Sequence, residues 1–299
     1  MIWVDTDFGF DDLWALLLLR HHDVAMAGVS LVAGNAPLPQ VKANALGANK
    51  AYGLAMPLYE GADRPLKRQA ETAQSILGFS GMQTRGRTLP FVPADAPMPA
   101  AVSALASWLM SAKEGEARDI LALGPLTNIA RLVQEHPQAI THISRLVWMG
   151  GGNGQGNHTP HAEYNAFADP EAAAIVMQAD LPLEIADLTL CRSVSFAEAD
   201  MPDSDPLTAD LLGGYFDIAL RRGRQKMSIY DPVAALAVVD PGGFAASAVD
   251  MVTVTQSGER YGATDFRRNP SARGRLLVKA PADAARRCLD VLKGELCAF

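Results

Sequence analysis

The feature that most constrains the fold lies at the start of the chain, where four carboxylates fall within eight residues. The string DTDFGFDD (5–12) follows the apolar segment 1–4 and precedes the apolar run LWALLLL (13–19). The first segment suits a short strand, and the run after the acids predicts a buried helix. Gly9 gives the connecting turn the backbone freedom that it needs. The acids are therefore predicted to lie at a strand-to-helix turn.

Acids held this close together repel one another, and a helix end offsets only part of that repulsion. Alternation along the strand puts Asp5 and Asp7 on one side, and Asp11 and Asp12 fall at or near the first helical turn. Backbone N–H groups at a helix start favour negative charge there. A bound cation would neutralise the set, and oxygen ligands favour a hard ion such as Ca²⁺ or Mg²⁺. The alternative is an Asp-rich capped turn that binds no ion.

Strand-like and helix-like segments alternate along most of the chain, which predicts an α/β fold. We expect an open, mostly parallel, Rossmann-like sheet with helices on both faces. Alternation around a Ser-Gly turn in 251–266 predicts a small C-terminal antiparallel hairpin. The expected strands are 2–6, 24–33, 118–123, 143–149 and 183–187. The expected helices are 12–21, 38–54, 100–113, 126–134, 170–179, 207–222, 231–238 and 282–293.

The bulk properties exclude several classes of protein. A net charge of −7 argues against a nucleic-acid partner, and no apolar run is long enough to cross a membrane. The 3 cysteines are widely spaced, which argues against a disulfide framework. No stretch is typical of an interdomain linker, so 1–299 is expected to be a single domain. Because no signal peptide precedes the first strand, we expect a cytoplasmic protein with a small-molecule partner.

Polar motifs follow several of the predicted strands, where ligands bind in open parallel sheets. Asn35 ends the string LVAGN, and the glycines of WMGGG (148–152) follow another strand. The segment GNHTPHAEYN (156–165) suits hydrogen bonding to a polyhydroxyl ligand such as a sugar, or is a surface loop with turn-forming Asn residues. Asp231, before a proline and an apolar helix, is either an N-cap or a further ligand.

Six motifs together resemble those of the nucleoside hydrolase family, the inosine–uridine-preferring ribohydrolases. They occur in the family's order along most of the chain. The motifs are VDTDFGFDD (4–12), LVAGN (31–35), LALGPLTNIA (121–130), WMGGG (148–152), GNHTPHAEYNAFADPEAA (156–173) and YDPVAAL (230–236).

The resemblance implies a Ca²⁺-dependent enzyme that hydrolyses the N-glycosidic bond of a ribonucleoside to ribose and free base, in nucleoside catabolism and salvage. It implies that Asp7 is the general base for a calcium-bound water. It also implies a homodimer or homotetramer. The implied calcium ligands are the carboxylates of Asp7, Asp12 and Asp231 and the carbonyl of Leu123. The implied ribose contacts are Asp11, Asn165 and Asp231 at the 2′- and 3′-hydroxyls, Asn157 and Glu163 at the 5′-hydroxyl, and Asn35 in the sugar pocket.

The chain departs from the family at the residues that would assist the departing nucleobase. Family members selective for inosine and uridine generally have His before the last aspartate, where this chain has Tyr230. A second family histidine falls in a string that here reads LGFSGM (77–82).

Three explanations stay open for leaving-group assistance. Tyr230 donates the proton, although a tyrosine with an ordinary pKa of about 10 is a weak acid. Alternatively, His158 or His161 reaches the leaving group. In the third explanation, the leaving group needs no acid or is not a common nucleobase. An arginine before Tyr230 would then meet a polar or anionic aglycone, or these arginines form a solvated helix end. The arginines are Arg221, Arg222 and Arg224.

Two other functions are compatible with the acidic turn. The missing histidines are the reason to consider a metal-dependent ribose or nucleoside binder without turnover as an alternative to the hydrolase. A DxD-type phosphatase would use Asp5 as nucleophile and Asp7 as acid. Such phosphatases need a later lysine and acidic pair, which the sequence does not match.

Overall fold

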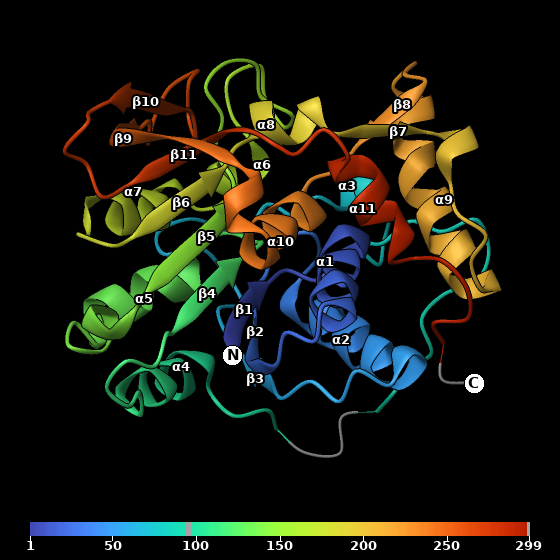
Figure 1. Cartoon of the computed structure of the whole chain (residues 1–299), viewed down its shortest axis with the longest axis horizontal. Coiled ribbons are helices and arrows are strands. Elements are labelled where there is room, and N and C mark those ends of the chain that lie inside the picture. The colour runs from blue at the N-terminus through green and yellow to red at the C-terminus, as the bar shows by residue number, and fades with distance from the viewer. Residues whose placement is uncertain (94–96, 298–299) are drawn as a thin grey trace.

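The computed structural model describes residues 1–93 and 97–297, and these form a nine-stranded sheet flanked by helices (Figure 1). Every neighbouring pair from β11 to β3 is parallel, whereas β9 runs antiparallel to both β10 and β11. In spatial order the strands are β10 (Thr264–Arg268), β9 (Ala245–Val254), β11 (Arg275–Lys279), β6 (Leu183–Ala186), β5 (Arg145–Met149), β4 (Asp119–Ala122), β1 (Ile2–Thr6), β2 (Met26–Leu31) and β3 (Leu58–Glu60).

Helices cover both faces of the sheet and enclose two hydrophobic cores (Figure 1). The helices of the first core are α1 (Phe10–His21), α2 (Leu38–Tyr52), α8 (Leu188–Ser193), α9 (Pro206–Arg221), α10 (Asp231–Val239) and α11 (Ala284–Asp290). The helices of the second core are α4 (Ala101–Met110), α5 (Thr127–Glu135), α6 (Tyr164–Ala168) and α7 (Pro170–Gln178). The remaining elements are α3 (Gln74–Leu77), the strand pair β7 (Ser195–Ala197) and β8 (Lys226–Ser228), and 3-10 helices at Ala139–His142, Glu198–Asp200 and Pro241–Gly243.

The central strands are buried on both faces because their side chains alternate between the two cores. In β1, Ile2 and Val4 belong to the first core and Trp3 to the second. In β5, Val147 belongs to the first core and Trp148 to the second. This alternation explains why the sequence of these strands is apolar without a polar face.

The predicted α/β architecture is confirmed, including the parallel sheet and the antiparallel hairpin of β9 and β10. The five-residue strand β11 was not predicted, nor were the strands β3, β7 and β8, which have three residues each. Three residues carry too little periodicity to distinguish a strand from a loop. No helix among the described residues is long and apolar enough to cross a lipid bilayer.

The turn between β1 and α1 places the acids at the carboxyl edge of the sheet. Gly9 is the N-cap of α1, and its N–H donates to Asp12 Oδ2 over 2.7 Å. Phe8 has a φ of 48°, which is uncommon for a residue with a side chain. Its N–H donates to the Thr6 hydroxyl over 3.0 Å. The side chain of Phe8 is fully buried, and we infer that core packing holds this strained residue in place.

Candidate active site

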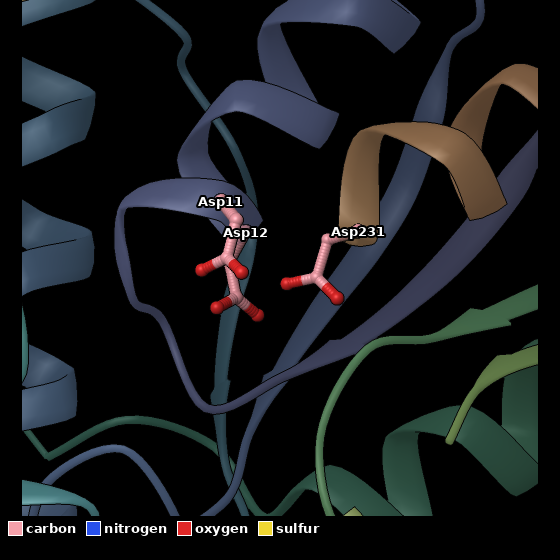
Figure 2. A group of neighbouring side chains, drawn as sticks. All are labelled: Asp11, Asp12 and Asp231. Carbon is pink, nitrogen blue, oxygen red and sulfur yellow. The ribbon is translucent and has the colours of Figure 1, made fainter. Parts of the chain in front are cut away.

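Three carboxylates from two distant helices converge at the edge of the sheet (Figure 2). Asp11 and Asp12 lie in the first turn of α1, and Asp231 is the first residue of α10. One carboxylate oxygen from each lies within 4.8 Å of the other two. The contact between α1 and α10 therefore brings together acids that are more than 200 residues apart in sequence.

Asp7 joins this group from the end of β1 and is held by Asn35. The two oxygens of Asp7 accept hydrogen bonds from the backbone N–H of Asn35, over 2.8 Å, and from its Nδ2, over 3.1 Å. The same Nδ2 lies 3.2 Å from Asp12 Oδ2. The side-chain amide of Asn35 thus links the carboxylate of Asp7 to that of Asp12.

Burial and mutual repulsion disfavour the charged forms of these acids. Burial, with repulsion from Asp12, raises the pKa of Asp11 to about 7 and that of Asp7 well above its ordinary value. Burial raises the pKa of Asp12 to about 6. Burial and the charges of Asp11 and Asp12 raise the pKa of Asp231 as well. Within residues 1–93 and 97–297, no lysine, arginine or histidine forms an ion pair with any of the four. This donor set fits a divalent cation.

Asp5 does not belong to the group, so the prediction that it shares a side with Asp7 was wrong. Asp5 is fully buried, and its Oδ1 accepts hydrogen bonds from the Ser30 hydroxyl and, over 2.8 Å, from Asn128 Nδ2. Strand β1 ends at Thr6, so its alternation does not extend to Asp7.

A cavity beside the carboxylates brings together nearly all the predicted site residues. Its wall includes residues from α1, α6 and α10 and from the loops that follow β1, β2, β4 and β5. The predicted residues that line it are Asp7, Asp11, Asn35, Leu123, Asn157, His158, Glu163, Asn165, Tyr230 and Asp231. Asp12 lies behind this wall, in the carboxylate cluster.

Asn165 is oriented by two backbone carbonyls. Its Nδ2 donates to the Leu123 carbonyl over 2.8 Å and to the Met149 carbonyl over 2.9 Å. Both amide hydrogens are thereby used, which leaves the Oδ1 of Asn165 as an acceptor. The Leu123 carbonyl keeps a second lone pair.

Glu163 is the N-cap of α6 and supports the wall of the cavity. One oxygen accepts from Asn165 N, and the other accepts from Gly151 N over 2.8 Å and Ala166 N over 3.1 Å. Burial raises the pKa of Glu163 to about 7.

Asn157 is fixed through its Oδ1, which accepts a hydrogen bond from the backbone N–H of Tyr164, so its Nδ2 remains a donor.

The two candidate histidines of the 156–165 segment differ in position. His158 lines the cavity, with its Nε2 3.0 Å from Glu71 Oε1 and its ring 4.2 Å from the Phe167 ring. His161 is exposed and is not part of the wall. His158 is therefore the one that remains a candidate.

Tyr230 and Leu77, which lie where the resemblance implies the two family histidines, both line the cavity. Burial raises the pKa of Tyr230, which makes it a weaker acid than an ordinary tyrosine. Tyr215 of α9 also lines the cavity and was not predicted. Its hydroxyl lies 3.5 Å from Asp11 Oδ2 and donates to the Ser228 carbonyl over 3.0 Å. No local motif marks this tyrosine, because its role depends on α9 packing against α1.

A model of the inosine-uridine preferring nucleoside hydrolases matches residues 2–290 of the chain. The chain therefore belongs to this family of enzymes, as its six motifs predict.

Sequence relatives and solved structures agree with this assignment. The pyrimidine-specific ribonucleoside hydrolase RihB of Escherichia coli (strains SE11 and K12 / DH10B) is 35% identical over 188 residues, which cover 62% of this chain and 59% of RihB. The structure of an inosine-guanosine nucleoside hydrolase matches with a TM-score of 0.84 and 22% sequence identity, and the match covers 97% of this chain and 98% of the hydrolase chain. The purine-preferring ribonucleoside hydrolase from Gardnerella vaginalis has a TM-score of 0.85 and 21% identity, with the same coverage. The two structures show that the fold is shared.

Proposed function

We propose that this protein hydrolyses the N-glycosidic bond of ribonucleosides in a Ca²⁺-dependent reaction that yields ribose and free base. The observation that carries the proposal is the convergence, in one cavity, of buried carboxylates and of amide groups with a free donor or acceptor. These groups come from segments spread between Asp7 and Asp231. Membership of the family and the names of the relatives support the reaction class.

The cation would be held by the carboxylates of Asp7, Asp12 and Asp231 and by the carbonyl of Leu123. Asp11 lies close enough to Asp12 and Asp231 to contribute as well. When bound, Ca²⁺ lowers the pKa of a water molecule. All these donors are oxygens, as a hard cation requires.

Asp7 would act as the general base that takes a proton from the attacking water. Two donor groups of Asn35 hold its carboxylate in a fixed orientation. Each carboxylate oxygen keeps a further lone pair for the incoming proton. Without the cation, burial and the charge of Asp12 raise the pKa of Asp7, and a bound cation would favour the ionised carboxylate that a base needs.

The remaining polar groups would bind the ribose and stabilise the transition state. Asp11, Asp231 and the free Oδ1 of Asn165 suit the 2′- and 3′-hydroxyls as acceptors, and Asn35 lines the sugar pocket. Asn157 Nδ2 and a lone pair of Glu163 suit the 5′-hydroxyl. Bond cleavage develops positive charge on the sugar, and an anionic wall stabilises that charge.

Assistance to the departing base would come from Tyr230 or His158, both of which line the cavity. Tyr230 is neutral and acts as a hydrogen-bond donor rather than as a strong acid, because burial raises its pKa. His158 is oriented by Glu71 and stands beside Asn157, on the segment proposed to bind the sugar.

The decisive experiment compares Asp7→Ala with Asp5→Asn in a riboside panel read by reducing-sugar release. Asp7→Ala should abolish turnover and weaken calcium retention, whereas Asp5→Asn should retain both because Asp5 lies outside the cavity. An Asp7→Ala variant with wild-type hydrolysis would refute the mechanism.

Two alternatives are distinguished in the same panel. A wild-type protein that binds ribose analogues but releases no base from purine, pyrimidine or nicotinamide ribosides is a binder without turnover. Cleavage of a general phosphomonoester without ribose release would indicate a phosphatase. The burial of Asp5 beside Ser30 and Asn128 argues against its use as a nucleophile.

A further inference from the structure

One part of the cavity wall has a composition unlike that of the carboxylate cluster. It is built by α3, the C-terminal half of α9 and β8, which contribute Ile76, Leu77, Ile218 and Met227. These elements are contiguous, because α9 contacts β8 and Arg221 Nη2 donates to the Ile76 carbonyl over 3.2 Å. These four side chains are apolar. Among the described residues that line the cavity, none of those on this wall is a carboxylate.

A single cation faces the cavity from this wall. Arg222, the C-cap of α9, is the one arginine or lysine among the described lining residues. The two nearby arginines are not available in the same way. Arg221 donates hydrogen bonds to Ile76 and Gln83, and Arg224 does not line the cavity. In the part of the chain that the structure describes, the Arg222 guanidinium forms no ion pair and no hydrogen bond. Its charge is therefore available to a ligand.

We propose that Arg222 stabilises the negative charge that develops on the departing base, so that the base leaves as an anion and Tyr230 or His158 serves only as a hydrogen-bond donor to it. This role rests on the proposed N-riboside hydrolysis. The C1′–N bond breaks and its electron pair stays on the base nitrogen, while a water oxygen forms the new bond to C1′. One proton of that water passes to Asp7, and the base anion takes up a proton from solvent.

The chemistry of the wall suits this role. A guanidinium stays charged across the working pH range and offers five N–H donors but no acceptor. Arg222 is an exposed residue that lines the cavity with Ile218 and Met227, so a bound base would displace water from its guanidinium and strengthen its attraction to an anion. The carboxylates elsewhere in the cavity suit the cationic ribosyl group, so the two charges that separate in the transition state meet opposite charges. Bases whose negative charge spreads onto ring carbonyl oxygens, such as oxo-substituted pyrimidines, fit these donors best.

The test compares two substrates that differ in their need for leaving-group assistance. Uridine has a poor leaving group, whereas 4-nitrophenyl riboside releases a stable anion unaided. Arg222→Ala should lower kcat for uridine by roughly 100-fold, as for loss of one charge-stabilising group, and should change turnover of 4-nitrophenyl riboside by less than about 3-fold. Arg222→Lys should recover part of the loss, and added ethylguanidinium should partly rescue uridine cleavage by Arg222→Ala.

Arg224→Ala is the matched control, because it removes the same charge two residues away from a side chain that does not line the cavity. It should cleave uridine at nearly the wild-type rate. Equal losses for both substrates in Arg222→Ala, or no loss for either, would overturn the role of Arg222 while leaving the hydrolase intact. A wild-type protein that cleaves neither substrate would reject the proposed function itself and this role with it.

Discussion

Removing the divalent cation should destabilise this protein at about pH 8 far more than at about pH 5, because ionised carboxylates then repel one another. The affected residues are Asp7, Asp11, Asp12 and Asp231, which have no cationic partner among the described residues. Chelation of the cation is the perturbation, and thermal unfolding is the measurement.

The expected size follows from Asp12, which is fully buried. Burial raises its pKa from 3.8 to about 6. A raised pKa means that the contribution of this group to stability is complete below about pH 4 and is lost as the pH rises through about 6. The whole shift of about two pKa units corresponds to about 3 kcal/mol, of which about 1.4 kcal/mol is lost between pH 5 and pH 8. For a chain of this length, the smaller figure amounts to a fall in Tm of roughly 2 °C.

The assay compares melting curves with excess Ca²⁺ and with a chelator at both pH values. Ca²⁺ should raise Tm clearly at the higher pH and little at the lower one, where protons already neutralise the cluster. Asp231→Asn should lose most of this calcium effect. Asp5→Asn should keep it, since Asp5 is a buried acid outside the cluster whose pKa is also raised by burial to about 6. Melting curves that do not respond to Ca²⁺ at either pH would refute the reasoning.

Three further predictions concern single side chains. Tyr230→Phe should change the ranking of ribosides without lowering calcium affinity, and a loss of calcium would contradict its placement on the aglycone side. Gly34→Ala should lower kcat at least about 10-fold, because a Cβ there overlaps the Asp7 carboxylate and displaces the base. Gly242→Ala, where a Cβ meets open space, is its control. Glu163→Gln should unfold with less dependence on pH between about 5 and 8, because the raised pKa of Glu163, about 7, makes its stabilising contribution decline over this range. An unchanged pH dependence in denaturant unfolding would contradict that account.

The fold was largely predictable because its strands and helices have strong local signals. The apolar strand before Asp5, the apolar helix after Asp12 and the Pro-led helix after Asp231 are all where the sequence predicts them. The carboxyl ends of parallel strands meet at one edge, so strand-end motifs such as Asn35 were expected to converge, and they do. The single-domain organisation and the homo-oligomeric state stay predictions.

The hydrogen-bond partners inside the site were not predictable. Periodicity does not show that Asn165 Nδ2 binds two carbonyls, that Asp5 turns toward Asn128, or that His158 pairs with Glu71. Each of these contacts joins segments that are distant in sequence, and their spacing along the chain carries no information about which segments meet.

By itself, the sequence determined the architecture and the chemical types present: a strand-to-helix turn rich in acids, amides on a later loop, and a tyrosine directly before Asp231. Local propensity and side-chain charge are properties of short segments, so they can be read without a structure. Only the tertiary structure decided which acids share a site and which arginine faces the cavity, namely Arg222 rather than Arg221 or Arg224. Both depend on how the helices pack against the sheet. Successive residues of an α-helix point about 100° apart around its axis, so the packing of α9 decides which side chain at its end meets the cavity.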